Sequence, residues 1–271
     1  MSHFDIRRAR NAPFDPEIDR ELMALTCHIT DDHFPCLQDY RALHPGQPDP
    51  HGHRLALVRE SLNEARPRLN LMVQMLRPLA GATGADVGPG WGFLDVLLVE
   101  RYGLQVACAE HPDNLAAYSG LLRARGIEVR PWRLGGEPCP FAAESLDFLI
   151  FGEVLEHLKL PPLRALGEVT APLRVGGTLL LTTPNIARQS NVELLHRGVN
   201  ILEPFREDIP PDLDVTDFVS HIREYTPLEV IDLVEACGLR VTDLVMCNLM
   251  GQELHPTPLL NHYTCLAAVK E

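Results

Sequence analysis

The chain has 271 residues, a hydrophobic content of 45% and a net charge of −13, which fit one large α/β domain, alone or with a small cap. This acidity argues against a nucleic-acid backbone as a partner, because proteins that bind one carry basic patches. The seven cysteines are scattered without a Cys-x-x-Cys pair and the N-terminus shows no apolar leader, so we expect a cytoplasmic protein without disulfides or a membrane span.

The first 80 residues are predicted to form a helical cap. Apolar residues at helical spacing predict one helix near Pro16–Thr26 and a longer one from about Leu55 to Leu76. A polar stretch rich in Pro and His, Asp31–His53, separates the two, and no strong strand signal occurs here. We therefore divide the chain into an N-terminal helical cap, residues 1–80, and a main domain, residues 81–271.

The most informative stretch opens the main domain and reads Asp86-Val87-Gly88-Pro89-Gly90-Trp91-Gly92. It joins a short strand candidate to an apolar helical run, Phe93–Val99. Glycines at alternate positions allow a sharp turn and let a ligand lie against bare main chain at a helix N-terminus. This pattern is typical of a nucleotide-type cofactor site at the carboxyl end of a parallel strand, although an ordinary strand-to-helix turn is the plain alternative.

From Thr83 onward, strand and helix patterns alternate. The predicted strands are Thr83–Val87, Leu104–Ala109, Ile127–Arg130, Leu146–Phe151, Thr178–Thr183, Arg240–Met246 and Tyr263–Val269. The predicted helices are Phe93–Tyr102, Asn114–Arg125, Pro162–Leu173 and Pro227–Cys237. Such alternation predicts a parallel sheet covered on both faces, with all strand-to-helix turns on one edge. The insert 184–225 breaks the pattern and is interpreted as lid-like.

Further polar groups are expected on that edge. Glu110 follows the second strand, 22 residues beyond Gly88, where a carboxylate suits hydrogen bonding to a ribose diol; an ordinary exposed carboxylate is the alternative. The fourth strand leads into Glu153-Val154-Leu155-Glu156-His157. The fifth strand follows Leu173-Arg174-Val175-Gly176-Gly177 and ends at Thr182-Thr183-Pro184-Asn185.

Taken together, these motifs resemble the class I S-adenosylmethionine-dependent methyltransferases, closest to the small-molecule branch that includes the ubiquinone-pathway O-methyltransferases. The stretch His221-Ile222-Arg223-Glu224-Tyr225-Thr226 is similar to the block that opens the late helix in that branch. The resemblance covers roughly residues 80–271 and implies a Rossmann-like, mostly parallel α/β sheet of seven strands with an antiparallel last strand. A nicotinamide enzyme would usually carry the third glycine one position later.

The resemblance implies S-adenosyl-L-methionine as the cofactor. The residues that would contact it are Asp86, Gly88, Gly90, Gly92, Glu110, Arg133, Leu134, Phe151 and Glu153. Two departures from the family stand out. Gly84-Ala85 replace bulky aliphatics, so we expect a weakly packed first strand, and Leu134-Gly135 stand where the branch often has Gly-Asp, so the adenine would rest on backbone and apolar contacts.

Two histidines and two glutamates suggest how an acceptor is activated. His157 and His221 are the candidate general bases, with a purely structural role as the alternative for each. Glu153, Glu156 and His157 would share one face of a helix that began there, and His221 would complete a site for Mg²⁺, Mn²⁺ or Zn²⁺. Some branch members and the related small-RNA 2′-O-methyltransferases hold a metal with such a cluster. Alternatively, the second glutamate only caps the helix.

We expect a methyltransferase that acts on a small molecule, most readily on a hydroxyl, with metal assistance as an option. Three alternatives stay open. They are an N-methyltransferase of a small metabolite or natural product, an RNA 2′-O-methyltransferase, and a non-catalytic cofactor-binding subunit.

Overall fold

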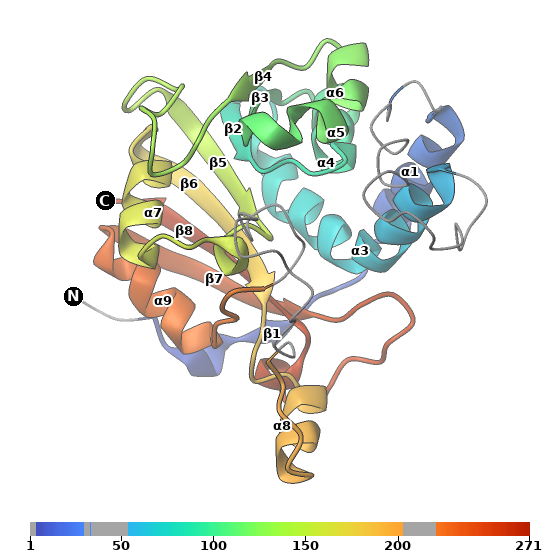
Figure 1. Ribbon diagram of the computed structural model, residues 1–271, viewed down its shortest axis with the longest axis vertical. Helices are drawn as coiled ribbons and strands as arrows, with labels where there is room; N and C mark the ends of the chain where they lie inside the picture. Colours follow the sequence, from blue (N-terminus) through green and yellow to red (C-terminus); the bar gives the residue numbers. More distant parts are fainter. Residues whose placement is uncertain (1–3, 30–32, 34–53, 203–220) are drawn as a thin grey trace, which may run out of the picture.

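The computed structural model describes residues 4–29, 33, 54–202 and 221–271. Its centre is one sheet with the strand order β1-β7-β8-β6-β5-β2-β3-β4 (Figure 1). The strands are β1 (Arg10–Asn11), β2 (Thr83–Val87), β3 (Gln105–Glu110), β4 (Val129–Pro131), β5 (Leu146–Gly152), β6 (Leu173–Pro184), β7 (Leu239–Cys247) and β8 (Tyr263–Lys270). β8 lies antiparallel between β6 and β7, and all the remaining strand pairs are parallel. The predicted Rossmann-like sheet with a reversed last strand is confirmed, but within the described residues it has eight strands rather than seven.

The extra strand comes from the N-terminal segment, for which the sequence predicts a helical cap and no strand. β1 pairs in parallel with β7, where Arg10 lies opposite Val245, and Ala12 N donates to Met246 O at 2.8 Å. Two residues are too few to give a periodic signal, so this edge strand is invisible to hydrophobic patterning. The first 80 residues therefore extend the sheet as well as cover it.

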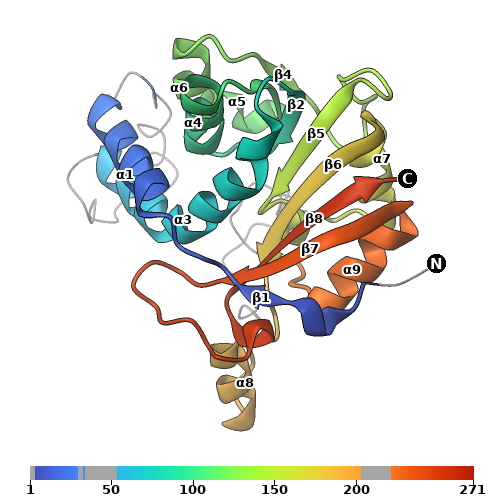
Figure 2. The same cartoon turned by 180° about the vertical axis from the view of Figure 1, so that it is seen from behind.

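Helices cover both faces of the sheet (Figures 1 and 2). The α-helices are α1 (Pro16–Leu25), α3 (Arg54–Leu76), α4 (Phe93–Tyr102), α5 (Leu115–Tyr118), α6 (Gly120–Ala124), α7 (Pro162–Thr170), α8 (Gln189–His196) and α9 (Pro227–Ala236). α1, α3 and α4 form one core with Phe148 and Ile150 of β5, whereas α7 and α9 form the other with Leu149 and Phe151. The single helix predicted over 114–125 is instead a 3₁₀ turn, η6 (Pro112–Asn114), followed by α5 and α6. None of the helices in the described part of the chain is both long and apolar enough to cross a lipid bilayer.

The expectation of a weakly packed first strand is wrong. A Cβ atom at Gly84 would lie 2.4 Å from the ring of Phe148 on the neighbouring strand β5. Phe148 is fully buried, as is Ala85. The absence of a side chain at Gly84 therefore makes room for the Phe148 ring, which fills this space and packs β2 against β5.

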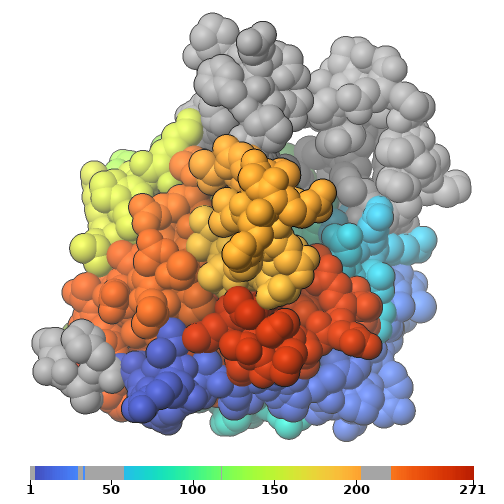
Figure 3. All heavy atoms as spheres, turned by 90° about the horizontal axis from the view of Figure 1, so that it is seen from below, coloured from blue at the N-terminus to red at the C-terminus, as the bar shows by residue number. Residues whose placement is uncertain are grey.

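The insert after β6 is only partly within the described residues, because 203–220 lie outside them. Its first part forms α8, which projects from one end of the molecule beside the segment that joins β7 to β8 (Figures 1 and 3). Its last part returns to the sheet, where Ile186 N donates to Tyr225 O at 3.1 Å. The late helix α9 then begins with the predicted capping box: Glu229 N donates to Thr226 Oγ1 and Thr226 N donates to the Glu229 carboxylate.

Candidate functional site

The glycine turn follows β2 at the carboxyl edge of the sheet. Gly88, Gly90 and Gly92 have φ angles of +77°, +54° and +76°, which side chains with a Cβ rarely adopt. A Cβ at Gly88 would lie 2.5 Å from Val154 Cγ2, and one at Gly92 would lie 2.6 Å from Leu122 Cγ. At Gly90, in contrast, no atom of the described residues, apart from Gly90 and its two chain neighbours, lies within 4 Å of that position. Two glycines thus permit close packing, while Gly90 borders open space.

Two buried carboxyl groups underlie this turn. Asp86 is the penultimate residue of β2 and is 4% exposed, and Asp95 in the first turn of α4 is fully buried. Among the described residues, Asp86 Oδ1 and both Asp95 carboxylate oxygens have no hydrogen-bond partner. Burial, and next the Asp95 carboxylate, raise the pKa of Asp86 well above its usual value, and burial raises the pKa of Asp95 to about 7. Asp95 is absent from the sequence-based site; its only signal was a charged residue within an apolar helical run.

Glu110 ends β3, the strand next to β2, and is 7% exposed. Its Oε1 accepts from His111 N at 2.7 Å and from Asn114 Nδ2 at 3.4 Å. Burial outweighs these hydrogen bonds and raises the pKa of Glu110 to about 7. The Glu110 carboxyl group therefore lies at the end of β3 beside the glycine turn. Additional hydrogen-bond donors from a ligand would favour its ionised form.

Arg133 and Leu134 lie in the loop after β4, one strand further along the edge. Arg133 Nη1 is 2.9 Å from His111 Nε2, which ties this loop to the residue that follows Glu110. Leu134 packs on the core beneath the sheet edge, and Gly135 N donates to the Glu168 carboxylate of α7 at 2.9 Å. The loop is thus held against its neighbours on both sides, with one cationic and one apolar side chain.

Phe151 and Gly152 end β5 at the middle of the edge, and Glu153 follows them. Phe151 is fully buried, so any contact it makes at the edge is through its backbone. Glu153 has a φ of +56°, rare for a residue with a side chain, and is held there by Glu153 N donating to Thr182 O at 2.9 Å. Its Oε1 accepts from Thr182 Oγ1 at 2.9 Å. No helix begins at Glu153, because only a 3₁₀ turn, η7 (Leu155–His157), follows, so helical spacing does not align Glu153 with Glu156.

Arg68 of α3 reaches this same strand end, and sequence reasoning missed it. Its Nε lies 3.8 Å from Glu153 Oε1, and its guanidinium stacks over Tyr263 at 5.3 Å from the ring centre. The side chain is 15% exposed, and Nε has no hydrogen-bond partner among the described residues. α3 carries several arginines, and only the packing of the helix decides which one faces the site.

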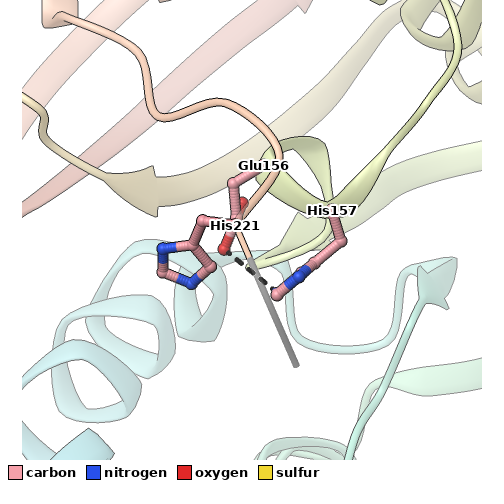
Figure 4. Close-up of side chains that lie close together, drawn as sticks. All are labelled: Glu156, His157 and His221. Atoms are coloured by element: carbon pink, nitrogen blue, oxygen red, sulfur yellow. Dashed lines mark ion pairs between the residues drawn. The ribbon is translucent and has the colours of Figure 1, made fainter. Parts of the chain in front are cut away.

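Glu156, His157 and His221 form the only metal-competent cluster that the described residues contain, with one ligand atom from each lying within 4.8 Å of the others (Figure 4). Glu156 is fully buried, whereas the two imidazoles are about one third exposed. Glu156 Oε2 accepts from Thr183 Oγ1 at 2.9 Å, and Glu156 Oε1 lies 3.8 Å from His157 Nε2. Burial, and next the Glu153 carboxylate, raise the pKa of Glu156 well above its usual value. Glu153 itself is not part of the cluster.

The cluster fits a divalent cation by its donor set. Glu156 Oε1 is buried without a hydrogen-bond partner among the described residues, and it is directed toward two imidazoles. One carboxylate oxygen with two imidazole nitrogens suits Zn²⁺ and Mn²⁺. A buried carboxylate oxygen without a donor is costly, and a cation would satisfy it.

His221 reaches the cluster because its segment is hydrogen-bonded to η7, the turn that follows β5. Ile222 N and Arg223 N both donate to Glu156 O, at 2.8 and 3.2 Å. The two imidazole rings meet edge to face, with centroids 5.0 Å apart. On its other side, His221 Nδ1 is 2.8 Å from Glu224 Oε1. Burial opposes the ionisation of Glu224, but hydrogen bonds with His221 and Arg188 prevail and lower its pKa to about 2.

Comparison with known proteins gives a domain and a fold. Residues 85–181 match the family model of a methyltransferase domain, a range that holds the glycine turn, Glu110 and the Glu156–His157 pair. No curated protein matches the sequence. The domain match does not distinguish the ubiquinone-pathway branch from its relatives.

Three solved structures illustrate the fold. A SAM-dependent methyltransferase from Aquifex aeolicus is 16% identical with a TM-score of 0.51, over 80% of this chain and 98% of that one. An O-methyltransferase family 2 protein from Planctomyces limnophilus, in complex with apigenin, is 17% identical with a TM-score of 0.53, over 80% and 60%. A SAM-dependent methyltransferase from Methanosarcina mazei is 18% identical with a TM-score of 0.51, over 70% and 93%. At these identities the likeness shows a shared fold.

Proposed function

The chain is a class I S-adenosyl-L-methionine-dependent methyltransferase, and from this premise we propose that it methylates a hydroxyl group of a small molecule with the help of a divalent metal ion. The observation that carries the proposal is the cluster of Glu156, His157 and His221 next to the end of β5. Methyl transfer from a sulfonium is an in-line displacement, so the protein must align the acceptor and help its proton to leave. Imidazole and carboxylate groups beside the methyl donor supply both functions.

We assign the cofactor half of the site to the strand ends β2, β3, β4 and β5. The backbone of Gly88, Gly90 and Gly92 would line the methionine and ribose parts, and Asp86 would anchor the turn. The ribose diol would donate to Glu110. Arg133 and Leu134 would flank the adenine, and Phe151–Glu153 would lie by the methionine moiety, at the open edge beside Gly90.

The pH dependence of cofactor binding tests the role of Glu110. Its pKa of about 7 in the free protein means that the carboxyl group is largely protonated below neutrality, while ribose hydroxyls donate best to the carboxylate. Binding then releases one proton, so we expect the affinity for S-adenosylhomocysteine to rise between about pH 6 and pH 8, by less than tenfold per pH unit, and to level off above. Calorimetric titration across this range measures it.

The E110Q variant is the control, because its amide does not titrate. We expect weaker binding and a flatter pH profile than in the unmodified protein. An unchanged slope in E110Q would assign the titration to another group, such as the Asp86–Asp95 pair, and would contradict the ribose role.

Arg68 extends this half of the site to the carboxylate of the methionine moiety. The guanidinium is nearly buried at the end of β5, and its Nε has no hydrogen-bond partner in the described part of the chain, so an anionic ligand there would complete its hydrogen bonds. The nearby Glu153 carboxylate is 3.8 Å away and also bonded to Thr182, so it does not satisfy Nε. We propose that Arg68 binds the cofactor carboxylate.

An R68M substitution should lower the affinity for S-adenosylhomocysteine by about 10- to 100-fold, since a hydrogen bond to a charged group contributes about 1.5–3 kcal/mol. Binding of 5′-methylthioadenosine, which lacks the amino-acid part, should change little. The matched control is R59M, which alters an exposed arginine on the same helix. Equal losses of affinity for S-adenosylhomocysteine and 5′-methylthioadenosine would show that Arg68 only holds α3 in place.

We assign the acceptor half to Glu156, His157 and His221, which would hold the ion. When bound, the ion would supply positive charge that lowers the pKa of the acceptor hydroxyl. Without the ion, His157 and His221 would be the candidate bases, and both imidazoles are partly exposed next to Glu156. Glu153, which the sequence also suggested as a ligand, lies outside this cluster and accepts from Thr182 Oγ1, so we do not assign it to the ion.

The proposal is tested by transfer of a labelled methyl group to a panel of phenols, catechols, aliphatic alcohols and amines. We expect label in hydroxyl-bearing acceptors, loss of turnover after chelation, and recovery with Mg²⁺, Mn²⁺ or Zn²⁺. Label in amines alone would contradict the hydroxyl acceptor. Full turnover in the chelator would contradict the metal and leave the histidines as bases.

A further inference from the structure

A second carboxylate stands behind the cluster, on the far side of His221. Glu224 Oε1 lies 2.8 Å from His221 Nδ1, and the Glu224 side chain is only 13% exposed. The two residues are three apart in the same segment, so a local turn sets their contact. Because Nδ1 is engaged by Glu224, the remaining nitrogen of the ring, Nε2, is the one available to Glu156 and His157.

Glu224 is itself held by an arginine from another element. Arg188 Nη1 donates to Glu224 Oε2 and also to Asn185 O at 3.1 Å. The Arg188 side chain is 17% exposed, so this ion pair is largely shielded from water. A shielded charge pair with a second hydrogen bond keeps its geometry better than a surface pair does.

The arginine is anchored in turn at the end of β6. Asn185 is fully buried and its amide donates to Leu259 O at 2.8 Å and to Asn261 O at 2.9 Å. Asn185 also pairs with Tyr225, next to Glu224, as an isolated parallel bridge. A continuous series of hydrogen bonds thus links Asn185 at the end of β6 to Arg188, Arg188 to Glu224, and Glu224 to His221.

We infer that Glu224 is a positioning residue that fixes His221 in the tautomer with the proton on Nδ1, and so presents the Nε2 lone pair to Glu156 and His157. A carboxylate accepts a hydrogen bond and cannot donate one when ionised, so the nitrogen facing it must carry the proton. Partners of this kind orient metal-binding imidazoles and raise their basicity. The inference deepens the proposed function of the cluster and rests on it for the use of Nε2. Arg188 secures Glu224 in the orientation that this requires.

The test reads the tautomer directly. Two-dimensional NMR of ¹⁵N-histidine protein, without metal and at a pH where the ring is neutral, should show the His221 proton on Nδ1. E224A should shift the proton to Nε2, and E224Q should do the same, because Arg188 takes the amide oxygen and the amide NH2 then donates to Nδ1. The matched control is E193Q, an exposed carboxylate on α8, which should leave the His221 signals unchanged. Circular dichroism of each variant verifies the fold.

Titration of Mn²⁺ then measures the consequence for ligand binding. We expect E224A and E224Q to bind Mn²⁺ about 10- to 100-fold more weakly than the unmodified protein, with E193Q unaffected. A proton on Nε2 in the unmodified protein, or an Nδ1 proton that survives in E224A, would overturn the inference. Should the tautomer change as expected while no variant binds Mn²⁺, the positioning role stands and the metal part of the proposed function fails.

Discussion

Replacing Gly90 by leucine should lower the affinity for S-adenosylhomocysteine by about 100-fold or more, because the new side chain would fill the space assigned to the ligand. Gly90 is the informative position in the turn. At Gly88 and Gly92 a Cβ would collide with Val154 and Leu122, so substitutions there would disturb the protein's own packing. At Gly90 the side chain would meet no neighbour among the described residues, so we expect it to collide with the ligand.

The backbone cost of this substitution has a matched control in G103L. Gly103 caps the C-terminus of α4 with a φ of +67°, and its Cβ position is also open. Both variants place leucine in a left-handed conformation at a cost of about 1–2 kcal/mol, so their melting temperatures should fall alike. Calorimetry should show that only G90L loses affinity for S-adenosylhomocysteine. Unchanged affinity in G90L, or equal losses in both, would contradict the assignment of the turn.

Alanine at His157 or His221 should each lower kcat by about 10²- to 10⁴-fold, the range expected when a proton-transfer group is removed. The affinity for S-adenosylhomocysteine should stay within about twofold, because both imidazoles belong to the acceptor half. Neither side chain is fully buried, so folding should survive the loss. Steady-state turnover and calorimetry on the same preparations separate the two effects.

The control for the histidine variants is H196A, an exposed histidine at the end of α8. It should retain full turnover. If H157A and H221A lowered the affinity for S-adenosylhomocysteine while kcat stayed unchanged, the imidazoles would belong to the cofactor half of the site. The proposed division of the sheet edge into a cofactor half and an acceptor half would then be wrong.

The sequence alone determined the parts of the site that depend on local backbone geometry. Three glycines at alternate positions after an apolar run specify a turn with positive φ, and Glu110 at the end of the next strand follows from strand spacing. Alternating strands and helices also required a parallel sheet with its strand-to-helix turns on one edge. These features are carried by residues close together in the chain, so patterning reveals them.

Tertiary structure decided every partnership between distant segments. Arg68 faces the end of β5 only because α3 packs with that side toward the sheet, and Phe148 fills the room left by Gly84. Glu153 leaves the expected helical face because β6 holds its backbone and carboxylate. Glu156 and His221 meet through backbone hydrogen bonds to the Glu156 carbonyl. Such contacts depend on side-chain shape and on unpaired donors and acceptors across the fold, which have no periodic trace in sequence.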